Sequence, residues 1–300
     1  MAKRSWTLKQ TGYVFVAVMV LPTVISWLIF GLIPDVSAVA HAFMDDRTGA
    51  FTLDNFKNVF ASLSDTTNGQ SLFTDFRNTM RYFAHGIIRM PFSLTLTYFL
   101  FKRIKGHNIY RTIFLLPGII PGLIWVTVYK EMTSMNGILG QICEALGTPM
   151  EQSLYKDGWT GTNALLVYGH WLGLAGGMLY YFSAMSRIPD SVFEAALLDG
   201  CGPGREAFQI VLPLIAPTVG TLFMLSVASM LSSSGPLLLF TKGQYGTSTL
   251  AFELYYRLLQ DPTGGIGIVT AIGMLMTAVS LPIALGTRFL TQKFFPDIEY

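Results

Sequence analysis

The sequence predicts an all-α integral membrane protein with six transmembrane helices, and three observations lead to this fold class. Hydrophobic residues make up 51% of the 300 residues and charged residues only 13%, about half the charged share of an ordinary soluble domain. The apolar residues gather in runs long enough to cross a bilayer at about 1.5 Å of helix rise per residue. The basic residues stand mainly between those runs. The six expected spans are residues 13–33, 78–101, 110–129, 163–185, 214–240 and 266–290.

The first run is expected to form an uncleaved helix. The segment 1–12 before it is basic, and the run 13–33 is longer than the apolar region of a signal peptide, which is about 7 to 15 residues. Pro22 is expected to kink this helix without breaking it. A cleaved signal peptide is the rival interpretation, because small residues follow at 37–42.

Two polar stretches between the runs predict external loops. The stretch 34–75 follows the first run, and we expect a short helix within it at about 55–63. The stretch 130–162 follows the third run. Neither contains a window apolar enough to enter a membrane.

The second run carries basic residues at every fourth position, Arg81, His85 and Arg89. Residues four apart share one helix face, so these form a stripe. An Arg within a span costs about 2.5 to 3.5 kcal/mol on insertion scales, so Arg89 is expected to face protein or a wet cavity. One interpretation is that the stripe lines a path for a polar or anionic molecule. The alternative is that Arg89 pairs with a carboxylate or carbonyls of a neighbouring helix, while Arg81 reaches to the external interface.

Aromatic residues in the third and fourth runs are further candidates. Pro117 and Pro121 predict an irregular, kinked third helix. Trp125 and Tyr129 lie one turn apart and form a candidate stacking surface, whereas a belt at the outer interface is the alternative and is favoured for Tyr129. Trp171 in the fourth run either lines the path or packs.

The fourth and fifth runs contain small residues. Gly173 and Gly177 predict close helix packing in the fourth run. Serines in the fifth run are expected to pack or to bond local carbonyls. The segment 232–236 has the alternative of unwinding, which would offer Ser233 to a polar ligand.

The segment 186–213 is amphipathic and predicts two short helices joined by a sharp turn. Ser191 and Glu194 have the spacing of a capping box, which would start the first helix. Gly200 stands where a C′ glycine would end it. Pro203 suits the first turn of the second helix.

Basic residues at the span ends set the topology. Lys102 and Arg103 follow the second span, and Arg288 and Lys293 end the last one. Because Lys and Arg favour the cytoplasmic side, both termini are expected in the cytoplasm. Six spans then place the segment 186–213 in the cytoplasm as well.

The segment 186–213 contains Glu194-Ala195-Ala196, Asp199-Gly200, Ile210 and Leu212-Pro213. This pattern resembles the EAA loop of ABC-importer transmembrane permeases and keeps the family's spacing from the Glu to the Pro. Two positions depart from the family, Ala207 in place of an aromatic residue and Cys201 in place of a small Ala. The resemblance implies a cytoplasmic coupling-helix elbow that docks into a cleft of an ATP-hydrolysing subunit.

Two other strings resemble the sugar-type permeases of this family. Leu53–Phe60 with Phe76–Thr79 is similar to the entry to their second helix, and Tyr110–Pro121 is similar to their third helix. The resemblance covers about residues 50–260 and implies the type I ABC-importer permease fold.

The resemblance implies a permease subunit that forms half of the translocation path for a sugar or oligosaccharide, and the basic stripe favours an acidic one. The expected partners are a second homologous permease, two ATP-binding-cassette ATPase subunits, an extracellular or periplasmic solute-binding protein and membrane lipid. No cofactor is expected in this chain, because the ATPase would bind ATP and Mg²⁺. The implied location is a bacterial or archaeal cytoplasmic membrane. The implied ATPase-coupling residues are Glu194, Ala195, Ala196, Asp199, Gly200 and Pro213, and the candidate path residues are Arg89, His85, Arg81, Trp125, Trp171 and Ser233.

Other classes of function fit the residues less well. The net charge of +2 is too small for a nucleic-acid surface, and the sequence has no phosphate-binding loop, G-x-S-x-G or H-E-x-x-H motif. We therefore expect neither an enzyme nor a metal site. The alternative function is an ion-coupled secondary transporter of a polar solute, which would need carboxylates deep in the spans, and the six expected spans contain none.

Overall fold

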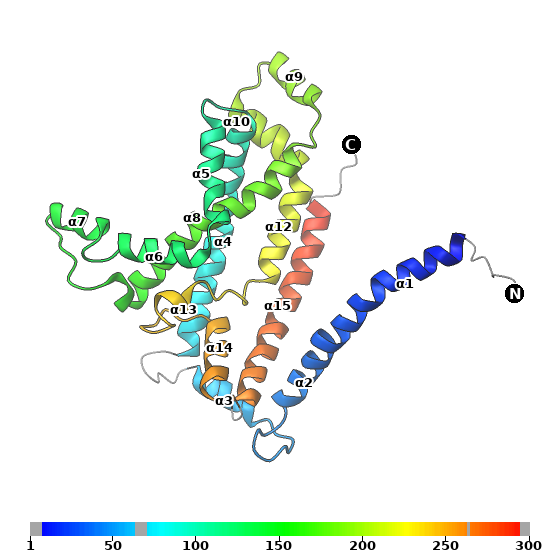
Figure 1. Ribbon diagram of the computed structural model, residues 1–300, viewed down its shortest axis with the longest axis vertical. Coiled ribbons are helices and arrows are strands. Elements are labelled where there is room, and N and C mark those ends of the chain that lie inside the picture. The colour runs from blue at the N-terminus through cyan, green and yellow to red at the C-terminus, as the bar shows by residue number, and fades with distance from the viewer. Residues whose placement is uncertain (1–7, 64–70, 263–264, 295–300) are drawn as a thin grey trace, which may run out of the picture. The chain divides into compact units, whose positions relative to one another are not determined.

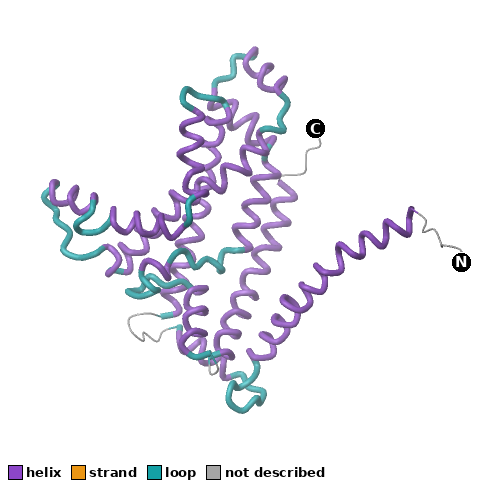
Figure 2. The backbone as a smooth tube through the Cα atoms, viewed as in Figure 1, coloured by secondary structure: helices purple, strands orange, loops and turns teal. Residues whose placement is uncertain are grey.

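The computed structural model describes residues 8–63, 71–262 and 265–294 (Figure 1). Within these ranges the chain forms helices and connecting loops, with one isolated antiparallel bridge between Met44 and Phe51 (Figure 2). The expected all-α class is confirmed. The chain divides into two compact units, Met1–Phe60 with Arg257–Leu275, and Ala61–Tyr256 with Met276–Tyr300. Most of the basic segment 1–12 and part of the expected loop 34–75 lie outside the described residues.

The first unit begins with one long helix. α1 (Leu8–Trp27) continues through a π-turn at Leu28–Leu32 into α2 (Ile33–Ala42). The expectation that the helix ends at residue 33 is therefore wrong. The π-turn ends two residues before Pro34, and in it the backbone hydrogen bonds run to the fifth preceding residue. With this shifted pattern the helix continues past Pro34, which has no N–H to donate.

Short polar contacts order the rest of the first unit. α3 (Asp54–Ser62) confirms the short helix expected at 55–63. The Asn55 amide donates hydrogen bonds to the carbonyls of Ala42 and Met44. The Asp46 carboxylate accepts the backbone N–H of Gly267 at 2.9 Å, in the first turn of α15 (Ile266–Phe294), where helix N–H groups have no partner within the helix.

The second unit is a helix bundle around a closely packed pair. α4 (Leu72–Phe101) packs on α8 (Gly158–Met185), and α5 (His107–Ile119) and α12 (Ala216–Ala228) contact this pair. A Cβ atom at Gly173 would collide with the Arg89 guanidinium, and one at Gly177 would collide with the Ser93 hydroxyl. The close packing predicted at these two glycines is confirmed.

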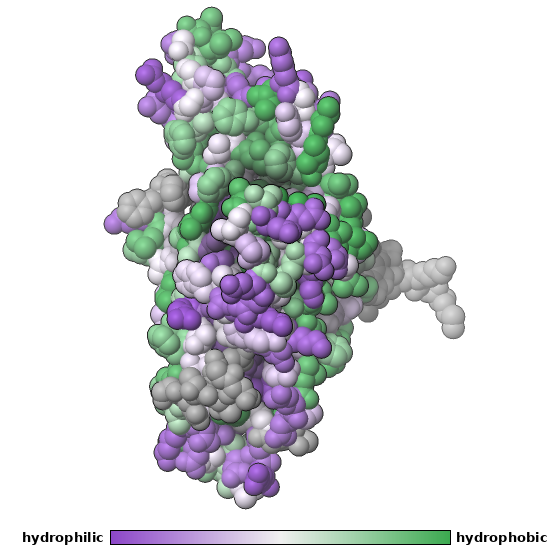
Figure 3. All heavy atoms as spheres, turned by 90° about the vertical axis from the view of Figure 1, so that its left-hand side faces the viewer, coloured by the Kyte–Doolittle hydropathy of each residue, from purple (hydrophilic) through white to green (hydrophobic). Residues whose placement is uncertain are grey.

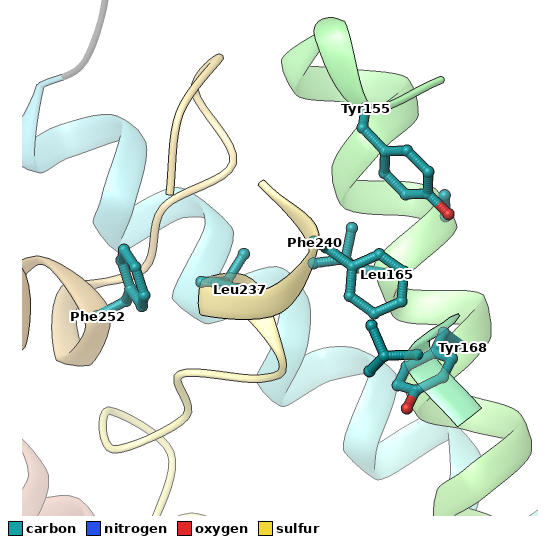
Figure 4. Close-up of a cluster of buried hydrophobic side chains, with 8 residues drawn as sticks. Tyr155, Leu165, Tyr168, Leu237, Phe240 and Phe252 are labelled. Atoms are coloured by element: carbon teal, nitrogen blue, oxygen red, sulfur yellow. The ribbon is translucent and has the colours of Figure 1, made fainter. Parts of the chain in front are cut away.

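Two hydrophobic cores hold the second unit together. One joins α8 to α6 (Gly122–Met132), α13 (Leu237–Phe240) and α14 (Leu250–Gln260). Its centre is the Phe240 ring, which lies 5.0 Å from the Tyr168 ring and 5.4 Å from the Tyr155 ring (Figure 4). The buried residues of the other core are Tyr98, Tyr181, Ala184, Met185, Ile188, Val211 and Ile215.

Two of the expected spans are not single helices. The third is broken rather than kinked, and α5 and α6 meet at 106°, because Ile120 is extended before Pro121. The fifth was expected as one helix over 214–240, but α12 ends at Ala228, so that expectation is wrong. The segment 232–236 is unwound instead, and Gly235 adopts a φ of 52°. The expected loop 130–162 also contains a helix, α7 (Ile138–Ala145).

Length and composition mark two helices of the described chain as able to cross a membrane, Phe15–Ala42 and Ile266–Lys293, and up to four if each of two bent helix pairs counts as one span. The expected spans 78–101 and 163–185 lie within α4 and α8. These two helices are not among those that length and composition mark, so the six-span topology stays a prediction. Large apolar side chains are widely exposed, as the green areas of Figure 3 show.

Candidate functional site

The segment 186–213 forms a two-armed elbow. Its first arm is α9 (Asp190–Leu198), and its second arm begins with α10 (Pro203–Glu206). Figure 1 shows α9 and α10 at one end of α4, α5 and α8. The sequence prediction of two short helices with Pro203 in the first turn of the second is confirmed.

The turn between the arms depends on Gly200. Its φ is 68°, a left-handed conformation that favours glycine. The Gly200 N–H donates to the Leu197 carbonyl, and the Cys201 N–H donates to the Ala196 carbonyl. These two bonds are those of a Schellman motif, which satisfies the last carbonyls of α9. The predicted C′ role of Gly200 is confirmed, and Asp199 is the residue just before it.

The predicted capping box at Ser191 and Glu194 is wrong. The cap position of α9 is Pro189, no side chain caps the helix, and Ser191 is already its second residue. Pro189 starts the helix two residues earlier than the Ser191 spacing suggests. Glu194 is exposed and has no capping role.

The second arm contains a π-turn. α10 continues through Ala207–Val211 into α11 (Leu212–Leu214), and the Leu212 N–H bonds the Ala207 carbonyl five residues earlier. Pro213 stands two residues after the end of this π-turn, as Pro34 does in the first unit. Pro213 has no N–H to donate, and the shifted hydrogen bonds of the π-turn let the helix continue past it. The arm then meets α12 at an angle of 72°.

The first arm has one face packed on the bundle and one face exposed. Ala196 is buried, and Val192 and Phe193 pack against the second core. Leu197 and Leu198 are 75% and 88% exposed. The exposed leucines, together with exposed Glu194 and Ala195, give α9 a small, partly apolar outer surface.

Three residues that the sequence did not predict as site residues hold the second arm at the end of α4. Glu206 of α10 is buried at 5% exposure. Its carboxylate pairs with the Lys102 ammonium at 2.7 Å and accepts a hydrogen bond from the Tyr98 hydroxyl at 3.2 Å. The only sequence signal was the presence of an acidic residue in the same segment as a basic cluster at the end of a span.

The stripe on α4 faces α8, as its four-residue spacing predicts. Arg81 donates to the Asn163 side chain at 2.6 Å and lies 4.2 Å over the Trp159 ring. The His85 and His170 rings are 5.0 Å apart. These contacts pair Arg81 with side chains of α8.

Arg89 has a second environment. One guanidinium N–H donates to the Gly169 carbonyl at 3.1 Å, and the side chain also lines a hollow of about 420 Å³. The other polar residues that line this hollow carry hydroxyl groups and are Ser93, Tyr180, Tyr181, Ser226 and Ser229. The residues lining the hollow include no carboxylate, so Arg89 makes it a basic, hydroxyl-rich site.

The other candidate path residues lie apart from this hollow. The Trp125 and Trp171 rings meet edge to face at 4.8 Å, so they pack together rather than present two open faces. Ser233 is in the unwound segment after α12 and is partly exposed. Among the six candidates, Arg89 alone is a lining residue of the hollow in the part of the chain that is described.

Comparisons with known proteins agree with this fold. No protein-family model matches the chain. A probable ABC transporter permease protein, YesP of Bacillus subtilis, is 27% identical over 298 residues, which are 96% of this chain and 92% of YesP. The maltose/maltodextrin transport system permease protein MalF of Escherichia coli K12 is 26% identical over 206 residues, 65% of this chain but only 40% of MalF.

Two solved structures are similar in fold. A chain of a bacterial ABC transporter involved in the import of the acidic polysaccharide alginate has a TM-score of 0.79 and 20% identity, covering 93% of this chain and 95% of that one. A chain of a bacterial alginate ABC transporter in complex with an alginate pentasaccharide-bound periplasmic protein has a TM-score of 0.80 and 21% identity, covering 98% and 99%.

Proposed function

We propose that this chain, a homologue of the carbohydrate-uptake permeases of ABC transporters with the fold of an ABC importer permease, is the permease subunit of a sugar importer. The observation that carries the proposal is the elbow. A left-handed glycine at Gly200 locks two short helices into one body, and α9 presents exposed leucines away from the bundle. Such a protruding body suits docking to another subunit.

The elbow would couple transport to ATP hydrolysis by another chain. Leu197 and Leu198 would enter an ATPase groove, and Glu194 and Ala195 lie on the same exposed helix. Ala196, Asp199, Gly200 and Pro213 would act by shaping the elbow, because Ala196 is buried, Asp199 and Gly200 form the turn and Pro213 follows the π-turn. ATP and Mg²⁺ would bind to that ATPase, and this chain would supply no catalytic group.

The hollow at Arg89 supports an acidic saccharide as cargo. Arg89 uses one N–H on Gly169, which leaves donors for a carboxylate. The serine and tyrosine hydroxyls beside it suit sugar hydroxyls. We expect Arg89→Gln to raise the KM for a uronic-acid oligosaccharide about tenfold or more, with a much smaller change for a neutral one. Equal changes for both cargoes would contradict an acidic subsite.

The complete importer would contain a second permease, two ATPases and a solute-binding protein. The path would run between the two permeases, so the hollow at Arg89 would form one side of it. The chain would cross a bacterial or archaeal cytoplasmic membrane six times, with both termini and the elbow on the cytoplasmic side.

Co-purification with the ATPase tests the coupling role of the elbow. Leu198→Glu puts a charge on a side chain that is 88% exposed, so the fold should tolerate it. We expect this variant to stay in the membrane but to lose the ATPase and uptake. The matched control is Leu146→Glu, at another leucine that is 74% exposed, which should keep both. Retention of the ATPase and of full uptake in Leu198→Glu would contradict the proposal.

A further inference from the structure

The buried carboxylate of Glu206 joins the elbow to α4. Glu206 lies in α10, and its side chain is 7% exposed. One carboxylate oxygen is 2.7 Å from the Lys102 ammonium and the other 3.1 Å from it. Both oxygens of the buried charge therefore meet the same cation, which compensates its loss of hydration.

Lys102 touches both arms of the elbow. It follows the last residue of α4, and besides the carboxylate in the second arm its ammonium lies 5.0 Å over the Phe193 ring in the first arm. The Phe193 ring is also 5.6 Å from the Phe101 ring of α4. One cation thus bridges α9, α10 and the end of α4.

Tyr98, one turn before Lys102, adds an uncharged hydrogen-bond donor. Its hydroxyl lies 2.9 Å from the Pro203 carbonyl and 3.2 Å from the Glu206 carboxylate. The hydroxyl has one proton, so these two acceptors share it. The Tyr98 hydroxyl thus contacts both the first and the last residue of α10.

The same helix carries the hollow. Arg89 and Ser93 lie on α4 and line it, and Arg89 is about 20 Å from Lys102 at about 1.5 Å per residue. α4 is one continuous helix over this length, with Pro91 inside it. A contact that keeps the elbow and α4 together would therefore pass a displacement of the elbow along α4 towards Arg89.

We propose that Glu206, Lys102, Tyr98 and Phe193 form a latch that fixes the coupling elbow to α4 and transmits elbow motion to the hollow at Arg89. The inference rests on the proposed function and assigns these four as positioning residues. The ion pair between Lys102 and Glu206 keeps the elbow attached to the end of α4. The Tyr98 hydrogen bond and the Phe193 ring fix the orientation of the elbow on α4.

The ratio of sugar transported to ATP hydrolysed tests the latch, in vesicles that hold the whole importer. Glu206→Gln keeps the shape but removes the charge, and Lys102→Met keeps most of the stem. We expect each to lower the ratio about fivefold, a usual size for coupling between sites, with ATP hydrolysis continuing. Lys102→Arg keeps a cation and should retain most of the ratio. The controls Glu144→Gln and Lys105→Met change exposed residues of the same types.

Folding and coupling are separated by a double variant. Lys102→Met with Glu206→Leu removes both charges together, so the complex should assemble normally, yet the ratio should stay low. A ratio equal to that of the unaltered complex in Glu206→Gln, or restored in the double variant, would overturn the latch while leaving the importer function intact. Absence of ATP-dependent uptake by the unaltered complex would overturn both.

Discussion

The two ends of α4 are tied to other segments by different chemistry. At the elbow end, Lys102 and Glu206 form an ion pair whose lysine side chain is 34% exposed. At the loop end, Asn78 is fully buried and donates to the carbonyls of Gly246 and Ser248 at 2.7 and 2.9 Å. Thr79 beside it accepts the Leu250 N–H at 3.0 Å.

The difference indicates a fixed end and a pivoting end. An amide between two carbonyls has one geometry, and moving it would leave buried polar groups without partners. A lysine ammonium is a point charge on a flexible stem, so Lys102 can follow Glu206 through a tilt of α10. We infer that α4 is anchored at the loop end and jointed at the elbow end.

The largest effect is expected from removing the cation at the elbow end. Lys102→Met leaves the Glu206 carboxylate buried without its countercharge, which costs about 3 kcal/mol. Thermal unfolding of the purified chain should show a large fall in midpoint, whereas Lys105→Met should show almost none. The double variant with Glu206→Leu should recover most of the loss. If the double variant is as unstable as the single one, charge compensation is not what holds this end.

A somewhat smaller loss is expected at the loop end. Asn78→Leu removes the donor for the Gly246 and Ser248 carbonyls, at a cost of about 2 kcal/mol. Because both of these acceptors are uncharged, no second substitution that removes a countercharge can rescue the loss, unlike at the elbow end. Asn136→Leu, at an exposed position, is the control in the same unfolding measurement. An unchanged midpoint in Asn78→Leu would mean that the loop end is not anchored.

The smallest effect is expected at Thr79. Thr79→Val keeps the shape of the side chain but takes the acceptor from the Leu250 N–H, which costs about 1 kcal/mol. Hydrogen exchange should become faster at the Leu250 amide and at the start of α14. Thr127→Val, whose hydroxyl bonds a carbonyl of its own exposed helix, should leave that exchange unchanged. If the Leu250 amide of Thr79→Val exchanges as slowly as in the unaltered chain, Thr79 does not contribute to anchoring the loop end.

Local signals in the sequence predicted the elements that depend on backbone geometry. Gly200 predicts a left-handed helix end because few other residues adopt that conformation. The Gly173 and Gly177 spacing predicts close approach of two helices. The Ser191 and Glu194 spacing failed, because Pro189 starts α9 before Ser191 can cap it. The predicted end of the first helix before Pro34 was wrong, because the π-turn that precedes Pro34 lets the helix continue into α2.

Contacts between distant residues could not be predicted from local signals. Glu206 and Lys102 are 104 residues apart, and nothing near either residue indicates the other. The stripe on α4 was visible, but only the fold shows that Arg81 meets Asn163 while Arg89 also reaches the hollow. The unwinding at 232–236 was one of two alternatives that the sequence left open, because its serines could equally pack within a continuous helix.

Uptake into vesicles distinguishes an ATP-driven importer from an ion-coupled transporter. The chain would be reconstituted with a second permease, the ATPases and an external solute-binding protein, with ATP enclosed and a uronic-acid oligosaccharide outside. We expect uptake that requires ATP and the ATPases and that persists when ionophores collapse proton and sodium gradients. Uptake by the permeases alone, driven by such a gradient and independent of ATP, would contradict it.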